Sequence, residues 1–299
     1  MPPSSIIPQS AFESSPLLSR LLTLHQIPKE IFIRGGLPII TIDDYGRSTP
    51  RMLTIVGSRK CTSYGKQALR EILKGFNKEE VIIVSGLAYG IDETAHSVAL
   101  EYNLTTIAIP GSGLDEKVLY PSSNRNLAKE IVANSGCLMS EFSDTTKAAK
   151  WTFPARNRIM AALSDAVIII EAEEKSGTLI TARQALELGK DIGAVPGEIF
   201  SETSKGALSL IRDGATPVTS SSDLRELLHL PTFDTIESTP SLGLSSHEQT
   251  LLSLLKEPKQ KNSLLTESNL SISEFMSAYT MLEIEGYIQE EFGEVRKIV

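Results

Sequence analysis

The sequence predicts an α/β fold, with a doubly wound, mainly parallel Rossmann-like sheet and a C-terminal winged-helix domain. Short apolar runs recur between residues 51 and 218, helical patterns separate most of them, and Gly-containing turns follow several runs. Strands that are apolar throughout are buried on both faces, which is typical of a parallel sheet covered by helices.

The expected elements alternate regularly along this part of the chain. The strands are Met52–Val56, Val81–Val84, Thr105–Ile109, Cys137–Ser140, Ala166–Ile170, Ile192–Val195 and Pro217–Val218. The helices are Tyr64–Phe76, Asp92–Tyr102, Asn124–Asn134, Asn157–Leu163, Thr178–Leu188 and Gly206–Arg212. Upstream, residues 31–41 predict two short strands joined by a Gly-Gly turn.

The domain boundaries follow from changes in composition. Residues 1–30 are expected to be a short N-terminal extension, 31–228 the Rossmann-like domain, and 229–246 a linker rich in Pro, Ser and Thr. Three helical patterns follow, at His247–Lys256, Asn262–Ser268 and Ser273–Glu285, and then two strands around Gly293. Within 247–299 this order fits a winged helix.

Composition indicates a cytoplasmic protein with no membrane span, metal or cofactor. No secretion signal is recognisable, and Cys61 and Cys137 lack a CxxC or metal-ligand spacing, so we expect reduced thiols. The net charge is −8, but residues from Asp234 onward hold 11 acidic and 5 basic side chains and account for −6 of it. A local basic groove in the first 233 residues is therefore compatible with the acidic total.

Glycine-rich turns follow the expected strands at residues 57–59, 85–92, 110–115 and 196–198. Backbone N–H groups gathered at one rim of a sheet attract anions. Any doubly wound sheet also needs tight turns, but several on one rim favour a phosphate site. Neither a P-loop nor a complete dinucleotide fingerprint is present, so ATP or NAD is not implied.

The most informative segment is FPARNRI, Phe153 to Ile159, followed after a strand by the turn EKSGTLITA. Arginine forks match phosphate oxygens, and a helix N-terminus offers N–H groups. We interpret Arg156 and Arg158 as a clamp on a phosphate backbone, one of them oriented by Glu171. Which arginine contacts phosphate stays open, and Glu171 could instead be an acid-base group.

Other side chains admit two interpretations. We expect His96 to pack rather than to act as a catalytic base, Asp92 to be a helix N-cap, and Trp151 to pack. Phe153 could stack on a base or pack. Ser176 and Thr178 could bond phosphate while capping their helix.

In these motifs the chain closely resembles the DNA-processing protein A (DprA/Smf) family, known from natural transformation. The likeness covers about residues 31–228, in unbroken order; among the shared runs are VGSR, VSGLAYGIDETAH, FPARNRIMAALS and EKSGTLITARQALELGK. The tail resembles that family's winged helix only in general form.

The resemblance implies a sequence-independent single-stranded DNA-binding protein and not an enzyme. Such proteins dimerise through the Rossmann-like domain and help load RecA recombinase onto incoming strands during homologous recombination. Carried to this chain, the DNA-binding candidates are Gly57, Ser58, Arg59, Lys147, Lys150, Phe153, Arg156, Asn157, Arg158, Ser176, Gly177 and Thr178. No catalytic or metal-binding residue is implied.

Two departures qualify this picture. Only about thirty residues precede the likeness, too few for the helical N-terminal domain of many members. The expected recognition helix, within SISEFMSAYTMLEIEG, has no Lys or Arg, although a helix that reads DNA needs donors. We therefore expect the winged helix to contact protein or form a dimer.

The alternative is an enzyme, a nucleoside-monophosphate phosphoribohydrolase of the lysine-decarboxylase-like type. Those enzymes resemble this chain at Gly177-Thr178 but place a catalytic Glu three residues after the Thr, where this chain has Thr181. Loss of that carboxylate argues against hydrolysis. A nuclease is disfavoured because no Asp/Glu cluster suits two metal ions.

Overall fold

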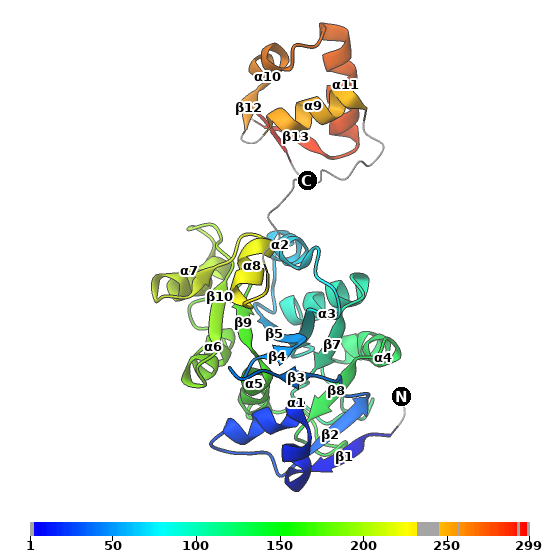
Figure 1. Ribbon diagram of the computed structural model, residues 1–299, viewed down its shortest axis with the longest axis vertical. Helices are drawn as coiled ribbons and strands as arrows, with labels where there is room; N and C mark the ends of the chain where they lie inside the picture. Colours follow the sequence, from blue (N-terminus) through cyan, green and yellow to red (C-terminus); the bar gives the residue numbers. More distant parts are fainter. Residues whose placement is uncertain (1–2, 232–244, 256–257, 292–293, 298–299) are drawn as a thin grey trace. The chain divides into compact units, whose positions relative to one another are not determined.

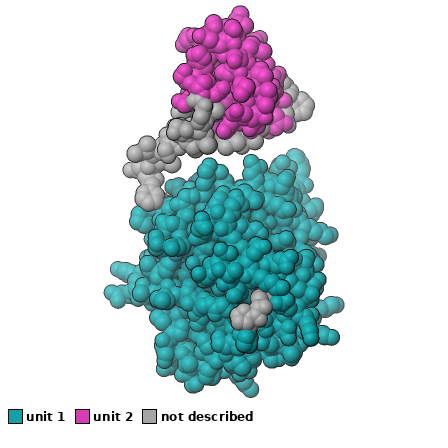
Figure 2. Space-filling model, turned by 90° about the vertical axis from the view of Figure 1, so that its right-hand side faces the viewer, with its two compact units in different colours: residues 1–233 teal, residues 234–299 magenta. Residues whose placement is uncertain are grey.

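The computed structural model describes residues 3–231, 245–255, 258–291 and 294–297 (Figure 1). The chain forms two compact units, residues 1–233 and 234–299, which are coloured separately in Figure 2. Each unit has a hydrophobic core of its own. They are described separately below.

The first unit is built on a nine-stranded sheet of order β1-β2-β8-β7-β6-β5-β9-β10-β11. Strands β5 to β11 are all parallel to one another, which confirms the doubly wound fold. From β5 the chain winds outward through β6, β7 and β8, and then returns to place β9 on the other side of β5. The parallel strands are β5 (Arg51–Val56), β6 (Val81–Ser85), β7 (Thr105–Ala108), β8 (Cys137–Ser140), β9 (Ala166–Ile169), β10 (Asp191–Ala194) and β11 (Thr216–Pro217).

Residues near the N-terminus belong to this sheet and its core. β2 (Glu30–Gly35) pairs antiparallel with β8 and with the edge strand β1 (Ser5–Pro8). Between them lie η1 (Gln9–Ser14), α1 (Pro16–Ser19) and η2 (Arg20–Thr23), whose apolar side chains are buried in the main core. The structure thus places this segment inside the unit and not in a separate extension.

The Gly-Gly turn does not form the expected hairpin. β2 makes no pair with β3 (Thr41–Ile42), which instead pairs with β4 (Ser48–Thr49). β2 pairs instead with β1 and β8 along its two edges, and its two faces are buried in different core clusters, with Ile31 and Ile33 in one and Phe32 in the other.

Helices cover both faces of the sheet (Figure 1). Alternate residues of β5 point to opposite cores: Leu53 and Ile55 pack with α2, α3 and α8, whereas Met52 and Val56 belong to the cluster with α1, α5, α6 and α7. The helices are α2 (Ser63–Leu73), α3 (Ile91–Glu101), α4 (Arg125–Ala133), α5 (Thr152–Leu163), α6 (Thr178–Glu187), α7 (Lys205–Arg212) and α8 (Ser221–Leu227), with 3-10 turns η3 (Ser122–Asn124) and η4 (Glu202–Ser204). Of these, α8 was not expected from the sequence.

The second unit contains three helices and a three-stranded antiparallel sheet of order β12-β14-β13. Buried Leu251, Phe275, Tyr279 and Leu282 form the centre of its core. The elements are α9 (Ser246–Leu254), β12 (Lys259–Gln260), α10 (Lys261–Ser268), α11 (Ile272–Ile284), β13 (Ile288–Glu291) and β14 (Glu294–Lys297). Their order agrees with the winged-helix prediction, although most of the expected linker and the turn at Gly293 lie outside the described residues.

Neither cysteine is in a disulfide: Cys61 is half-buried beside the turn after β5, and Cys137 is buried in β8. Burial raises the pKa of the Cys137 thiol to about 12, so this thiol stays protonated. None of the described helices is long and apolar enough to cross a membrane.

Candidate nucleic-acid interface

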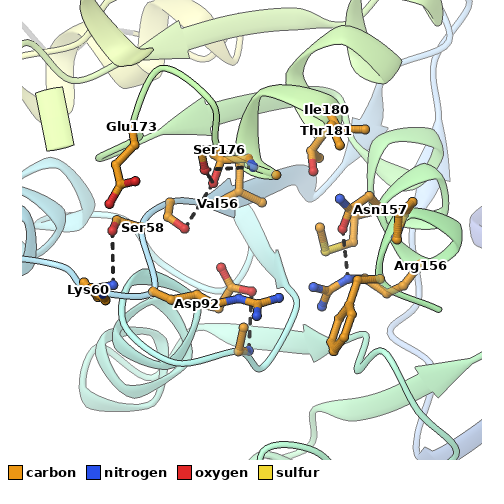
Figure 3. Close-up of a pocket in the computed structure, with 18 of the residues that line it drawn as sticks. Val56, Ser58, Lys60, Asp92, Arg156, Asn157, Glu173, Ser176, Ile180 and Thr181 are labelled. Atoms are coloured by element: carbon orange, nitrogen blue, oxygen red, sulfur yellow. Dashed lines mark hydrogen bonds between the residues drawn. The ribbon is translucent and has the colours of Figure 1, made fainter. Parts of the chain in front are cut away.

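A cavity of about 550 Å³ opens at the carboxyl ends of β5 and β9, where the winding of the sheet reverses (Figure 3). Ligands of open α/β sheets bind at such a switch point. Its wall comes from the turn after β5, the first half of α5 and the turn before α6. In Figure 3, Arg156 and Asn157 lie across the hollow from Ser58 and Lys60.

The structure brings together ten of the twelve residues selected from the sequence. The two that do not line the cavity are Lys147 and Arg158. Those that do are Gly57, Ser58, Arg59, Lys150, Phe153, Arg156, Asn157, Ser176, Gly177 and Thr178.

Three exposed cations stand at this cavity: Arg59, Lys60 and Lys150. The Arg59 guanidinium lies over the Phe153 ring, 4.9 Å from its centroid, so a cation and an aromatic ring present one combined surface. The backbone N–H of Lys60 donates to Ser58 Oγ at 3.1 Å and thereby fixes the turn. Sequence reasoning missed Lys60, although its place directly after Arg59 was an available signal.

Helix α5 begins at Thr152, five residues earlier than the expected Asn157. Thr152 Oγ1 donates to the Gly111 carbonyl at 2.6 Å and ties the start of the helix to the turn after β7. In a helix of 3.6 residues per turn, side chains two positions apart point in very different directions. Arg156 and Arg158 therefore point away from each other, and of the two only Arg156 lines the cavity.

Arg156 is a buried side chain that holds the rim of the sheet together. Its Nη1 donates to the carbonyls of Gly86 (2.5 Å) and Ile109 (2.6 Å), and its Nε donates to Asn157 Oδ1 (3.1 Å). Burial lowers the pKa of this guanidinium, with Asp92 acting in the opposite direction. Nη1 and Nε of Arg156 thus already donate within the protein.

Arg158 points to another part of the molecule. Its guanidinium donates to the Glu141 carboxylate and, at 2.6 Å, to the Gln26 carbonyl. Glu171 contacts neither arginine: it accepts from the N–H (2.9 Å) and Oγ1 (2.6 Å) of Thr62, the N-cap of α2. The orienting role expected for Glu171 is therefore wrong, because both of its oxygens accept from Thr62 and hold the N-cap of α2 in place.

The turn before α6 is less open to an anion than the sequence suggested. Ser176 Oγ accepts from the N–H of Thr178 at 3.1 Å, and the next two amides donate to the carbonyls of Ser176 and Gly177. Thr178 Oγ1 donates to the Gly57 carbonyl at 3.1 Å and joins the two turns. These contacts satisfy several helix-start donors internally, so side-chain cations dominate the anion affinity of the cavity.

Close packing explains several rim glycines. A Cβ on Gly86 would lie 1.7 Å from Arg156 Nη1, and one on Gly111 would lie 2.6 Å from the Phe153 ring. A Cβ on Gly57 would meet Ile91 at 2.5 Å. At these three positions glycine is required so that side chains can pack against the rim. These glycines therefore have a structural role that does not depend on a phosphate site.

Asp92 and His96, both on α3, are buried. The N-cap is Gly90, and Asp92 lies in the first turn, so the capping prediction is wrong. Burial raises the pKa of the Asp92 carboxyl, while the charges of Arg156 and Arg59 oppose that effect. His96 Nδ1 lies 2.7 Å from Thr106 Oγ1, and burial lowers the pKa of its ring to about 3, which agrees with packing as a neutral side chain.

Trp151 does not pack in the interior, since 63% of its surface is exposed. Its ring contacts Phe142 edge-on, with 5.3 Å between centroids. Thr181, at the position where the hydrolases carry Glu, is buried in the cavity wall. Among the described residues, no group of His, Cys, Asp and Glu has an arrangement that could hold a metal ion.

Comparison with known families agrees with this architecture. The family model described as DNA recombination-mediator protein A matches residues 11–229. The chain belongs to this family. DNA processing protein DprA of Streptococcus pneumoniae is 39% identical over 204 residues, 68% of each chain. The Bacillus subtilis DprA is 38% identical over 208 residues, which cover 70% of this chain and 67% of the relative.

Solved structures of family members share the fold. That of S. pneumoniae DprA superposes with a TM-score of 0.65 and 34% identity, over 75% of this chain and 74% of the other. DNA processing protein A of Helicobacter pylori gives a TM-score of 0.60 and 31% identity, over 76% of this chain and 95% of the other. The H. pylori structure concerns the single-stranded DNA binding mode of that protein.

Proposed function

We propose that this chain is a cytoplasmic, sequence-independent single-stranded DNA-binding protein that acts in homologous recombination, including natural transformation. The observation that carries the proposal is the cavity at the switch point, with exposed Arg59, Lys60 and Lys150 around the Phe153 ring. Cations beside an aromatic face are what a single strand needs, because phosphates pair with the cations and bases stack. Family membership supports the same conclusion.

In this mechanism different residues of the cavity contact phosphates, stack on a base and support the cavity wall. Arg59, Lys60 and Lys150 neutralise phosphates, and Phe153 offers a face to a base. Arg156 and Asn157 hold the wall in shape, and Asn157 lies at its surface, lining the cavity. No contact in this scheme reads a base edge in a groove, so affinity should depend little on sequence.

The test is a charge reversal, Arg59→Glu, with oligonucleotide affinity measured by fluorescence anisotropy across a salt series. We expect binding to fall by at least about tenfold, since a cation becomes an anion beside phosphate, and the wild-type log–log salt slope to be about −0.7 per phosphate neutralised. Arg212→Glu, at a side chain on α7 outside the cavity, is the matched control. Wild-type binding that ignores salt, or equal affinities for the two variants, would refute the mechanism.

We further propose that the chain forms a homodimer through the Rossmann-like unit and hands its strand to RecA recombinase. Both parts are what the resemblance to the DNA-processing protein A family implies, and the description of the family as a recombination mediator agrees with the second. Sedimentation of the purified chain and of its mixture with RecA tests them. A monomer at all concentrations would contradict the first part, and no co-sedimentation with RecA would contradict the second.

The proposed role is binding without catalysis. Thr181 in the cavity wall supports this, because a hydroxyl cannot supply the carboxylate that the hydrolase mechanism uses. Incubation with AMP followed by assay for free adenine is the decisive measurement. Turnover that Arg59→Glu abolishes would favour the phosphoribohydrolase alternative instead.

A further inference from the structure

Beyond the cavity, the geometry points to a second base-binding subsite formed by Tyr89 and Tyr120. We propose that a single strand leaving the cavity passes over these two rings, so that bases following the one at Phe153 stack on them. This inference rests on the proposed function and extends it in one direction, toward the carboxyl ends of β7 and β6.

The two tyrosines continue a row of rings that starts inside the cavity. Phe153 lines the cavity, and its centroid lies 5.9 Å from that of Tyr120. Tyr120 in turn lies 6.4 Å from Tyr89. Ala88, next to Tyr89 in the chain, also lines the cavity, so the row meets the cavity wall at Phe153 and beside Tyr89.

The orientation of the rings leaves room for bases. The interplanar angles are 64° for Tyr120 with Phe153 and 81° for Tyr120 with Tyr89, so these rings meet edge to face and not in a closed stack. Tyr89 is 42% exposed and Tyr120 is 41% exposed. An aromatic side chain that stays so exposed offers stacking area to any base, whatever its sequence.

A buried side chain holds the two tyrosines in place. Asn124, which is 2% exposed, donates from Nδ2 to the carbonyls of Leu87 (3.1 Å) and Ala88 (3.4 Å). It thereby ties η3, directly after the Tyr120 loop, to the turn that carries Tyr89. Holding the rings before the strand arrives lowers the ordering cost of binding.

The occupant is argued from continuity with the cavity. Three cations and the Phe153 ring lie at one end of the row. A strand bound there is close to the next ring, Tyr120, whose centroid is 5.9 Å from that of Phe153. Stacking on an exposed ring raises affinity by roughly 5- to 100-fold per base in single-strand-binding proteins. A site of this kind gains affinity as the oligonucleotide becomes long enough to reach it.

The experiment compares oligothymidylates of about 4 to 16 nucleotides, the range of site sizes known for single-strand-binding folds. Affinities of the full chain are measured by anisotropy for wild type, Tyr89→Ala and Tyr120→Ala. We expect each alanine variant to lose roughly 5- to 100-fold on the longest strands and to match wild type on the shortest, which fill only the cavity. Tyr89→Phe and Tyr120→Phe keep the rings and should retain wild-type affinity.

Tyr64→Ala is the matched control, because Tyr64 is 50% exposed on α2 and lies outside both the row and the cavity lining. Thermal unfolding of each variant checks the fold. Unchanged affinity of Tyr120→Ala at every length overturns the inference, as does an equal loss at every length, which would mean that Tyr120 acts only by supporting Phe153. If the wild type binds no oligonucleotide, the proposed function itself fails; if it binds and Arg59→Glu does not, only the subsite is in question.

Discussion

The turn after β5 and the first half of α5 each supply one arginine to the same cavity, and the two arginines differ in what surrounds them. Arg59 is exposed and rests on the Phe153 ring, whereas Arg156 is buried and donates to two backbone carbonyls and to Asn157. The first can exchange water for phosphate at little cost. The second builds the wall against which a ligand packs.

This difference teaches that a cation in a binding motif can serve either the ligand or the fold. A guanidinium whose donors are engaged by carbonyls loses those bonds if it turns to a ligand, and each buried acceptor left unpaired costs about 1–3 kcal/mol. Substitution at the two positions should therefore give different kinds of defect.

The largest effect is expected from Arg156→Ala. Two carbonyls and the Asn157 side chain lose their donor in a buried place, so the free energy of unfolding should fall by about 3–5 kcal/mol. Urea denaturation followed by circular dichroism measures it. A loss below about 1 kcal/mol would show that Arg156 is not a structural residue.

Arg158→Ala should cause a smaller loss of stability and leave DNA affinity unchanged. Its ion pair with Glu141 is only partly buried, so a loss of about 1–2 kcal/mol is expected. Anisotropy with single-stranded DNA should give a dissociation constant within about twofold of wild type, because Arg158 does not line the cavity. A tenfold weaker complex would instead support the clamp interpretation, in which Arg158 contacts the phosphate backbone.

Asp92→Asn should strengthen DNA binding above the raised pKa of the wild-type carboxyl. Where the wild-type carboxyl is ionised, it places a negative charge in the wall of a site for phosphate, and the isosteric amide removes that charge, for a gain of about two- to fivefold. Burial raises the pKa of Asp92, so the wild-type carboxyl becomes neutral as pH falls through that raised value. The advantage of the variant should vanish there, and an advantage independent of pH would contradict this account.

Removal of the second unit should have the smallest effect. α11 carries no Lys or Arg, and its exposed side chains include Ile272 and Ile284. Because each unit has its own core, residues 1–233 alone should fold and bind single-stranded DNA within about twofold of the full chain. A much weaker complex would assign the second unit a role in DNA binding.

The sequence predicts the sheet well because buried parallel strands leave a strong pattern of continuous apolar runs. All the parallel strands from β5 to β11 were expected within one or two residues of their observed bounds. The edge strand β1 was missed, since SIIP is short and mostly exposed. The early start of α5 was also missed, although Pro154 in its first turn is compatible with a helix N-terminus.

The sequence predicted most residues of the candidate site, but not the hydrogen-bond partners of its charged side chains. Carboxyl ends of parallel strands meet at one edge, so Gly57–Arg59 and Ser176–Thr178 had to lie together. Apart from Asn157, the partners named for Arg156, Arg158 and Glu171 lie 17 to 132 positions away in the chain, and no local pattern records such contacts. Burial of a cation is decided by tertiary packing alone.

The two thiols differ in burial, so one of them can be labelled selectively. Cys137 is sealed in β8 with a pKa of about 12, so it resists maleimide and iodoacetamide, which react with thiolates. Cys61 is half-buried and follows Arg59 and Lys60 directly. Partial burial also raises the pKa of the Cys61 thiol, so at alkaline pH a fluorescent dye can be attached there without any substitution, two residues from Arg59, and its emission can follow a DNA strand as it arrives.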